Sequence, residues 1–415
     1  MKALVLLLIA RTAAADPLDE LGFGAAAAGM ATARTAIATG AEAVHLDPAG
    51  VARIDEPEVL IAYSYAWNHL AIDGHDAGVS NAHGTSLGLA IPLAIGGVRI
   101  AGGVAVYLPD QFLARLQLTP ISEPSFVRFA SAQQRIVVEP VAAIDLGDVA
   151  IGAGASILAD ARSRDLTFDV GGTASKRSGT ATLDLSLPLR AAPLVGVWWR
   201  VAPNLELAAT FRGELSLDLA LDIRANVDVP GVVTGDAIVS LRSASYYTPA
   251  RGTLAAAYRT PGAVYTAELG FERWHALGSG VPDLRIAIEL DVAPPLVSTL
   301  QPPAHFHDIP TARLGTERTY GNWRLRGGLA WLPSPVPAQT GLTSFADGDR
   351  YVAAAGVGRH VTSSWLTEPL ELDLGVVYQH VAHELVVKNF ALQPGGAFSS
   401  GGDVLQGSAS ATVRF

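Results

Sequence analysis

Few residues of this chain have types and spacing that could support chemistry. His305 and His307 lie two positions apart, so on a strand they would share one face and could bind a metal ion, but no third ligand accompanies them. Ser and His are both present, yet no spacing singles out a nucleophile and its base. The Gly-x-x-x-x-Gly-Lys-Ser/Thr loop that holds nucleotide phosphates is absent. The sequence therefore predicts no enzyme activity, no cofactor and no metal site.

Three arginines have the chemistry to bind a carboxylate. Arg212, Arg324 and Arg326 lie among alternating apolar residues, and a guanidinium group can hold a carboxylate through two parallel hydrogen bonds. We interpret them as possible partners of a carboxylate ligand. The other interpretation is that they pair with the chain's own charges on the same face and hold a plug. The further charged residues expected on that face are Arg135, Glu139, Glu206, Glu214, Glu268, Arg285, Glu371 and Asp373.

The elements that would position these residues show a period of two. From Leu205 to Val229 every odd position is apolar or Gly, whereas the even positions include Glu206 and Asp222. Side chains alternate between the two faces of a strand, so one face is apolar and the other charged. A soluble strand averages about five or six residues. We interpret this segment as one strand that crosses a bilayer, which takes about 9–11 residues, and then projects outside.

The composition points to a membrane without a membrane-spanning helix. The 415 residues are 49% hydrophobic and 16% charged, with a mean hydropathy of +0.30, whereas soluble domains carry about 25% charge. The longest apolar run, 3–10, is shorter than the roughly 20 residues that a spanning helix needs. With Lys2 before it and Ala13–Ala15 after it, this run predicts a signal peptide at 1–15, removed before Asp16.

Charge and cysteine content restrict the partners. The net charge of −10, without a basic run, argues against nucleic acid, because phosphates require clustered Lys and Arg. The chain has no Cys and hence no disulfide. A secreted, apolar chain with no spanning helix can cross a membrane only as a closed barrel.

We therefore predict an all-β, antiparallel transmembrane barrel of about 14 strands in residues 56–415, in the outer membrane of a Gram-negative bacterium. Short turns alternate with long loops, as is typical of such barrels, and tryptophans at strand ends (Trp67, Trp199, Trp274, Trp331) fit the interfacial aromatic girdles. The C-terminal Phe415 is the type of residue that the outer-membrane assembly machinery recognises. The expected strands are 57–69, 84–95, 98–108, 133–145, 149–170, 179–201, 205–229, 237–259, 264–275, 305–320, 322–332, 348–361, 368–382 and 404–415.

Residues 16–55 do not alternate and are expected to form an N-terminal hatch. The segment is rich in Ala and Gly from Ala25 to Ala43, and small residues allow close packing in a crowded space. A barrel of about 14 strands is wider than the eight-stranded barrels that side chains can fill, so a segment of this length could plug it. The alternative is a flexible tail, but such tails are usually more polar.

A resemblance to a known family rests on three motifs. Gly22-Phe23-Gly24, Gly29-Met30-Ala31 and Asp47-Pro48-Ala49-Gly50 resemble the hatch of the FadL-type long-chain fatty-acid transporters, in which an Asn typically stands where this chain has Asp47. The Asp keeps an acceptor but loses the amide donor. Residues 331–337, with their Ser-Pro-Val-Pro element, resemble the family's segment before the last strands.

The resemblance implies uptake of fatty acids or aromatic hydrocarbons and lateral release into the bilayer beside the third strand. Glycine weakens a strand, so we interpret Gly96, Gly97, Gly102 and Gly103 as a kink that forms this lateral gate. Ordinary turn and packing roles remain the alternative for each glycine.

The loop 109–132 is unusually apolar and would face the lipopolysaccharide layer, which a hydrophobic solute must cross. Exposed apolar patches often mark binding sites. We interpret this loop as a ligand-binding groove, and a lid in which loops pack together is an equally good interpretation. Its apolar residues are Phe112, Leu113, Leu116, Leu118, Ile121, Phe126 and Phe129.

The leading function is passive uptake of hydrophobic small molecules, with outer-membrane lipid, lipopolysaccharide and the assembly machinery as further partners. A porin for polar solutes would instead conduct ions and lack a plug in the lumen. An outer-membrane lipid-modifying enzyme would need a Ser–His pair at the membrane edge. A structural or adhesive surface protein is the fourth possibility.

Overall fold

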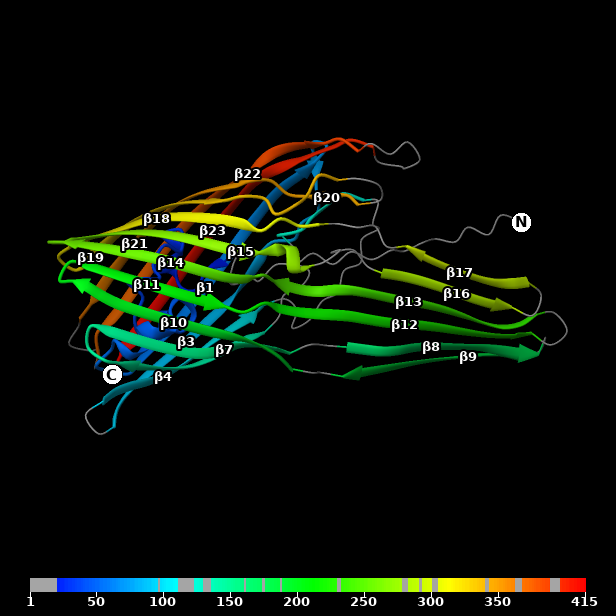
Figure 1. Cartoon of the computed structure of the whole chain (residues 1–415), viewed down its shortest axis with the longest axis horizontal. Helices are drawn as coiled ribbons and strands as arrows, with labels where there is room; N and C mark the ends of the chain where they lie inside the picture. The colour runs from blue at the N-terminus through cyan, green and yellow to red at the C-terminus, as the bar shows by residue number, and fades with distance from the viewer. Residues whose placement is uncertain are drawn as a thin grey trace.

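Fourteen antiparallel strands of the described residues close into a barrel, because β1 pairs with both β3 and β23 (Figure 1). The computed structural model describes residues 21–415 except 96–97, 111–122, 130–135, 160–161, 174–175, 187–188, 230–232, 278–282, 291–292, 301–304, 340–342, 363–367 and 389–395. The predicted signal peptide at 1–15 lies outside these residues. The barrel strands, in chain order, are β1 (Glu58–Ile72), β3 (Ala82–Ile95), β4 (Val98–Pro109), β6 (Val137–Asp145), β7 (Val149–Ala159), β10 (Leu189–Ala202), β11 (Leu205–Arg212), β14 (Ala250–Thr260), β15 (Ala263–Arg273), β18 (Ile309–Tyr320), β19 (Trp323–Leu332), β21 (Arg350–Val361), β22 (Leu370–Val386) and β23 (Phe398–Arg414).

The period-two pattern separates the outside of the barrel from its lumen, as predicted. On β15, Leu269 is 67% exposed and Phe271 is 53% exposed, whereas Glu268 and Glu272 are buried. A lipid-facing wall must be apolar, and polar groups must find partners inside. Within the described residues, no helix is long and apolar enough to span a membrane.

Aromatic residues lie on the outer wall, and Trp199 and Trp331 lie near the ends of β10 and β19, in agreement with the expected girdles. Trp67, Trp199 and Trp331 are 40%, 49% and 39% exposed. Trp274 is the exception, because it is only 4% exposed and belongs to η3 (Trp274–Leu277), a turn of helix that packs inward beyond β15. The prediction for Trp274 was therefore wrong.

The long alternating segments are divided into two strands each. The segment 205–229 was predicted as one strand, but it breaks after Arg212 into β11 and β12 (Leu215–Val229). At the break, the pairing of β11 with β14 ends at Arg212 and Arg251, whereas the backbone N–H of Gly213 still donates to the carbonyl of Pro193 on β10. The alternation of apolar and polar residue types continues through the break into β12.

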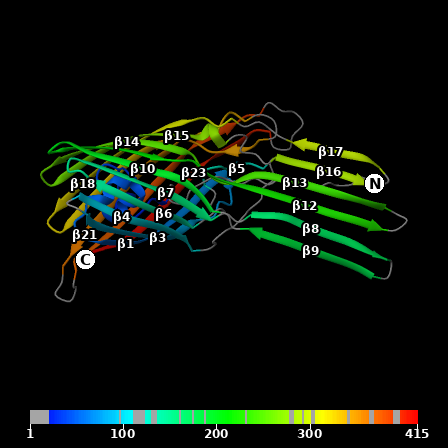
Figure 2. The same cartoon turned by 60° about the horizontal axis from the view of Figure 1, so that its bottom comes forward.

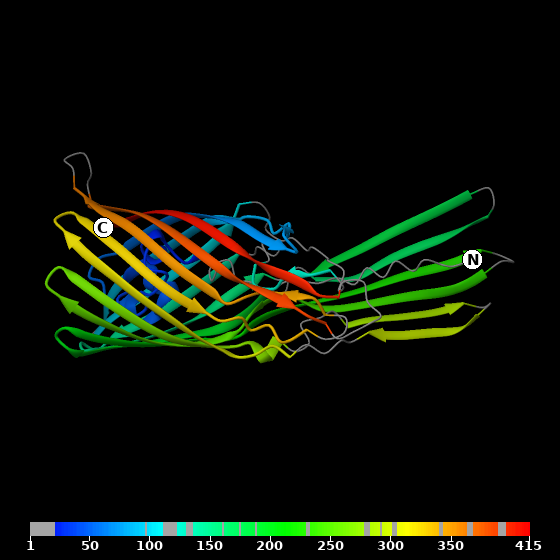
Figure 3. The same ribbon diagram turned by 90° about the horizontal axis from the view of Figure 1, so that it is seen from above.

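The outer halves of the divided segments form a second sheet beyond the barrel (Figures 1 and 3). It has six strands in the order β17-β16-β13-β12-β8-β9, and its β12–β8 pair is parallel. Arg285, expected in the lumen, lies on β16 of this second sheet, so that prediction was wrong. Its other strands are β8 (Arg162–Thr173), β9 (Lys176–Ser186), β13 (Val233–Thr248), β16 (Asp283–Leu290) and β17 (Ala293–Leu300).

The two ends of the barrel differ. At one end short turns join neighbouring strands, including β10 to β11 and β14 to β15, and the C-terminus lies there. At the other end are the long connections and the six-stranded sheet, which Figure 2 shows projecting from that end only. Small elements there are β2 (His75–Asp76), β5 (Ser125–Phe126) and β20 (Phe345–Ala346).

Residues 21–54 lie inside the barrel and are almost entirely buried. Their elements are short: α2 (Ala25–Ala28), α3 (Gly40–Leu46) and η1 (Pro48–Ala52). Small residues allow the segment to touch the wall backbone to backbone. A Cβ at Gly356 of β21 would come within 2.9 Å of Cα of Gly29, and one at Gly375 of β22 would come within 2.6 Å of the Ala25 carbonyl.

Candidate functional site

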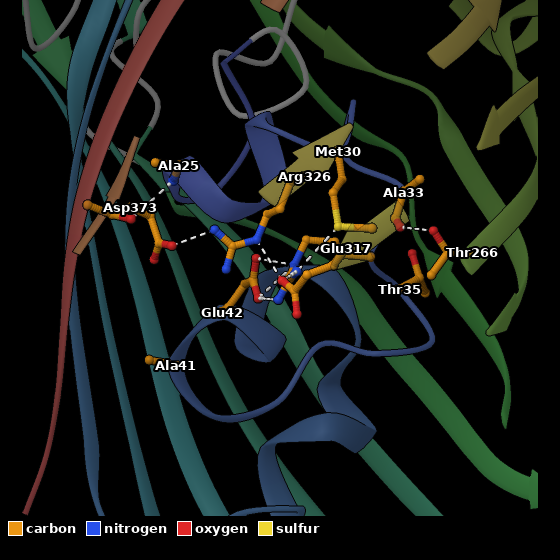
Figure 4. A network of polar contacts seen from close by, with 12 residues as sticks. Ala25, Met30, Ala33, Thr35, Ala41, Glu42, Thr266, Glu317, Arg326 and Asp373 are labelled. Atoms are coloured by element: carbon orange, nitrogen blue, oxygen red, sulfur yellow. Dashed lines mark hydrogen bonds and ion pairs between the residues drawn. The ribbon is translucent and has the colours of Figure 1, made fainter. Parts of the chain in front are cut away.

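The inner segment is held by charged side chains that form a buried network (Figure 4). Arg34 pairs with Glu42, 3.0 Å away and also in the segment, and with Glu317 of β18 at 3.1 Å. Arg326 of β19 then pairs with Glu317 at 2.6 Å and with Asp373 of β22. Arg326 also lies 3.5 Å from Glu371, which pairs with Arg324, so three cations of this network face four carboxylates. Breaking such a buried pair on one side costs about 3–5 kcal/mol, because the remaining charge stays buried.

A second set of contacts holds the end of α3. Nδ1 of His45 lies 2.7 Å from Glu139 of β6, and Arg212 of β11 pairs with the same carboxylate. Arg212 also donates to the backbone carbonyl of His45 at 2.9 Å. Glu139 and Arg212 lie on β6 and β11, which β7 and β10 separate in the sheet, so they hold the end of α3 to two strands of the wall.

A third set of contacts, all hydrogen bonds, holds the stretch of the segment that connects α2 and α3. The hydroxyl of Thr266 donates to the carbonyl of Ala33 at 2.6 Å, and the backbone N–H of Thr35 donates to Glu268 at 2.7 Å. The indole N–H of Trp198 donates to the Ala36 carbonyl at 3.2 Å. These bonds satisfy backbone groups that a non-helical stretch would otherwise leave buried without partners.

Asp47 begins the Asp47-Pro48-Ala49-Gly50 motif and caps η1. Its Oδ1 accepts a hydrogen bond from the backbone N–H of Ala49 at 3.1 Å, and Pro48 follows at the first helical position. The side chain lies against Gly196 of β10, where a Cβ would meet it. Its Oδ2 is buried and has no hydrogen-bond partner among the described residues. An amide at this position would carry no charge into that environment.

The cavities between the segment and the wall are small. One of about 60 Å³ is lined by polar groups such as Thr35, Arg212 and Glu268. Another of about 40 Å³ is lined partly by apolar residues, including Leu332 and Val352. Each has room for a few water molecules, whereas ligand pockets usually measure about 300–1,000 Å³. A hydrophobic solute therefore needs the segment to move before it can pass through this part of the lumen.

The three arginines expected to bind a ligand carboxylate already pair with carboxylates of the chain. Arg212 pairs with Glu139, Arg324 with Glu371, and Arg326 with Glu317 and Asp373. A ligand carboxylate would have to displace one of these partners. Arg212 contacts the inner segment directly and Arg326 reaches it through Glu317, whereas Arg324 pairs with Glu371 of the wall.

The apolar loop residues that the structure describes face inward. Phe126 and Phe129 are 3% and 1% exposed, and their rings meet edge to face at 6.1 Å. Next to them, Arg128 pairs with Asp347 at 2.8 Å and donates to the carbonyls of Pro333 and Gly348. For these two residues the lid interpretation fits better than an exposed groove. Phe112, Leu113, Leu116, Leu118 and Ile121 lie outside the described residues.

The Ser-Pro-Val-Pro element belongs to the same outer mouth. Ser334 donates from its backbone N–H to Asp349 at 2.9 Å and from its hydroxyl to Asp347 at 2.9 Å. Aromatic rings continue the closure, with Trp274 6.4 Å from Phe306 and Phe306 5.3 Å from Phe345. These rings and the buried Arg128–Asp347 pair lie at the end of the barrel that carries the long connections.

Two of the glycines expected to form a lateral gate stand in an unbroken ladder. Gly102 and Gly103 of β4 pair with Ile91 and Ala90 on one side and with Ala142 and Val141 on the other. Gly96 and Gly97 lie outside the described residues. Lateral release at this strand stays a prediction, and it would require these pairs to open.

Sequence reasoning missed Arg34, Glu42 and Glu317, which are central to the network. Arg34 is the only charged residue between Leu21 and Ala41, in a run of small residues, and that isolation was the available indication. Glu317 could not be assigned as its partner, since 283 positions separate the two residues. Among the described residues, no group of three or more His, Cys, Asp or Glu side chains could hold a metal ion.

Comparison with known proteins gives one short sequence match and several matches of the whole fold. A 76-residue stretch, 18% of this chain, is 38% identical to the long-chain fatty acid transport proteins of Escherichia coli K12 and Salmonella typhi, and it spans only 16% of each of them. No family model matches the chain.

Three solved structures cover nearly the whole chain. A Pseudomonas aeruginosa FadL homologue is 17% identical with a TM-score of 0.61, and the match covers 95% of this chain and 98% of that one. The toluene transporter TodX of P. putida is 15% identical with a TM-score of 0.54, covering 95% and 99%. The toluene transporter TbuX of Ralstonia pickettii is 14% identical with a TM-score of 0.53, covering 95% and 98%. These likenesses show the fold.

Proposed function

We propose that this chain, an outer-membrane barrel with the fold of the FadL-type transporters, takes up hydrophobic small molecules passively. The sequence resemblance to that family is confirmed. The observation that carries the proposal is the inner segment: residues 21–54 fill the lumen, yet polar contacts at separate points hold them there. Such a plug can be displaced without unfolding the barrel.

The cargo follows from the relatives and from the outer mouth. The relatives are named for long-chain fatty acids and for toluene, and aromatic side chains around Phe306 form a cluster at the end of this barrel that carries the long connections. We propose fatty acids or aromatic hydrocarbons as cargo. Lipopolysaccharide sugars exclude such molecules from the bilayer, so an apolar entrance above the membrane serves uptake.

The proposal also includes how the chain crosses the inner membrane and inserts into the outer membrane. A signal peptide at 1–15 would direct the chain across the inner membrane. Phe415, whose ring is 60% exposed at the end of the last barrel strand, would be available to the assembly machinery. The role is transport, and we propose no catalytic step.

An engineered disulfide between the inner segment and the barrel wall tests whether the segment must move. The chain has no Cys, and a Cβ at Gly88 of β3 would lie 3.1 Å from Cβ of Ala41 in α3, near the roughly 3.5–4.5 Å of a disulfide. The double variant Ala41→Cys/Gly88→Cys should lose uptake of radiolabelled oleate and toluene when oxidised and recover it when reduced. Each single variant controls for the oxidant. Uptake that continues through the oxidised double variant contradicts the proposal.

Deleting residues 16–50 separates this function from the porin alternative. Removal of a plug should raise ion conductance in planar bilayers, whereas the full chain should conduct weakly. A full chain that already conducts like an open pore, or a deletion that leaves conductance unchanged, would remove the plug from the mechanism.

A further inference from the structure

Two arginines stand on the outer face of the barrel at the end with the short turns, which lies at the left in Figure 1. Arg318 of β18 and Arg359 of β21 are both exposed, and each lies two residues before the end of its strand. Their neighbours on that face are apolar: Leu314 is 57% exposed, and Leu325, which pairs with Arg318, is 49% exposed. The two cations therefore lie at the edge of the wall that contacts lipid.

An exposed aromatic ring lies beside each of these guanidinium groups. Cζ of Arg318 is 5.0 Å from the centre of the Tyr320 ring, and Cζ of Arg359 is 4.9 Å from that of the Trp323 ring. Tyr320 and Trp323 pair with each other across the turn that joins β18 to β19, and the Cβ atoms of such a pair are about 5 Å apart. The two arginines, although they come from strands on opposite sides of β19, therefore converge on one pair of neighbouring rings.

Arg318 and Arg359 differ from other arginines at this end in their charge balance. Within the part of the chain that the structure describes, neither forms an ion pair with a carboxylate. A guanidinium group that stacks on a ring keeps the N–H donors along its edge available to an anion. Two positive charges thus face the membrane surface without a partner from the wall. Other arginines at this end do pair with carboxylates, namely Arg200 with Asp148, Arg259 with Glu206 and Arg414 with Glu58.

The membrane at this level supplies an anion of one chemical kind. Short turns of outer-membrane barrels face the periplasm, and the periplasmic leaflet consists of glycerophospholipids, whereas lipopolysaccharide occupies the other leaflet. Aromatic residues of an interfacial girdle lie at the level of the headgroups, and a guanidinium group binds phosphate oxygens through parallel hydrogen bonds. We propose that Arg318 and Arg359, beside the rings of Tyr320 and Trp323, bind the phosphate of phosphatidylglycerol, an anionic lipid whose charge complements theirs.

Native mass spectrometry of the purified full chain tests this site. The chain is mixed with phosphatidylglycerol and phosphatidylcholine that have the same acyl chains, and it should retain phosphatidylglycerol in preference. Arg318→Gln/Arg359→Gln should lower retention of phosphatidylglycerol about tenfold, since a hydrogen bond to a charged group contributes about that factor, and should leave retention of phosphatidylcholine unchanged. Arginines that only extended their charges toward water would give no preference between the two lipids.

Arg200→Gln is the matched control. Arg200 lies at the same end, 5.3 Å from the centre of the Trp198 ring, and its side chain is 49% exposed, but it pairs with Asp148 and that ring is buried. This variant should retain phosphatidylglycerol as the wild-type chain does. Resistance of the unboiled barrel to denaturing detergent reports folding in each variant. Equal losses in Arg200→Gln and in the double variant, or no loss in the double variant, would overturn the proposal.

A measurement on the wild-type chain alone keeps the test independent of how the variants fold. Its preference for phosphatidylglycerol should decrease as salt rises, because ions screen charges at an exposed site. Equal retention of the two lipids at low salt, or a preference that salt does not change, would each contradict the proposed site. Uptake of oleate is not part of this test, so its outcome stands apart from that of the proposed function.

Discussion

Arg326 and Asp373 pair across the strand that separates theirs, and the pair passes over Gly358. Arg326 lies on β19 and Asp373 on β22, with β21 between them. A Cβ at Gly358 would lie 2.8 Å from Nη1 of Arg326 and would also meet the Asp373 carboxylate. The absence of a side chain on β21 is therefore what allows a bond inside the barrel to bridge three strands.

Gly358→Ala should weaken this bridge. Crowding of a packed site costs about 1–3 kcal/mol, so the thermal midpoint of the folded barrel should fall. Gly327→Ala is the matched control, since a Cβ there would find nothing closer than 3.8 Å. Equal midpoints for the two variants, measured by the heat-dependent gel shift, would show that the bridge contributes nothing.

Arg34→Leu should loosen the inner segment. The change leaves Glu42 buried without its 3.0 Å partner, at a cost of about 3–5 kcal/mol. Hydrogen exchange of residues 21–54 and ion conductance should both rise. The double variant Arg34→Leu/Glu42→Leu removes both charges and should recover part of the loss. A double variant worse than the single one would contradict this explanation.

Asp47→Asn and Asp47→Ala should shift stability in opposite directions. The Asn variant keeps an acceptor for the Ala49 N–H and removes a charge from a buried atom that has no partner. It should protect the segment from hydrogen exchange. The Ala variant loses the cap, which is worth about 1 kcal/mol. The expectation fails if Asn destabilises the segment as much as Ala does.

The contact between His275 and Asp308 should depend on pH. Burial would raise the pKa of Asp308, but hydrogen bonds from the backbone and ring of His275 outweigh it and lower that pKa. The contact is therefore complete above the ordinary aspartate pKa of about 3.9 and is lost as pH falls through the lowered value.

In that acidic range the carboxyl group of Asp308 becomes protonated and no longer holds His275. Hydrogen exchange of η3, corrected for the intrinsic rate, should therefore increase. Asp308→Asn should show the same exchange on both sides of the transition. An acid transition that persists in Asp308→Asn would assign it to another group.

Alternation predicted the barrel well because lipid outside and polar groups inside impose a period of two on every strand. The boundary between two expected strands, 305–320 and 322–332, also agrees within one residue with the end of β18 at Tyr320 and the start of β19 at Trp323. The same pattern concealed the division of 205–229. The alternation of residue types continues into β12, although β12 belongs to a second sheet and not to the barrel.

The site was less predictable because its partners are distant in sequence. Thr35 bonds to Glu268, 233 positions away, and Gln406 donates to the carbonyl of Leu21, 385 positions away. No local spacing encodes such contacts. The loss of alternation predicted that a separate segment precedes the barrel, whereas only the folded barrel shows which wall residue each part of it meets.

The parallel pair of β8 and β12 has a mechanical consequence. It joins the hairpin of β8 and β9 to the hairpin of β12 and β13. The pairing of β13 with β16 adds the hairpin of β16 and β17, so three connections form a single arm. With 15 residues in β12, at about 3.3 Å each, the arm is about 50 Å long. A pull at its tip would act as a lever on the strands at its base, including β11, the strand that carries Arg212.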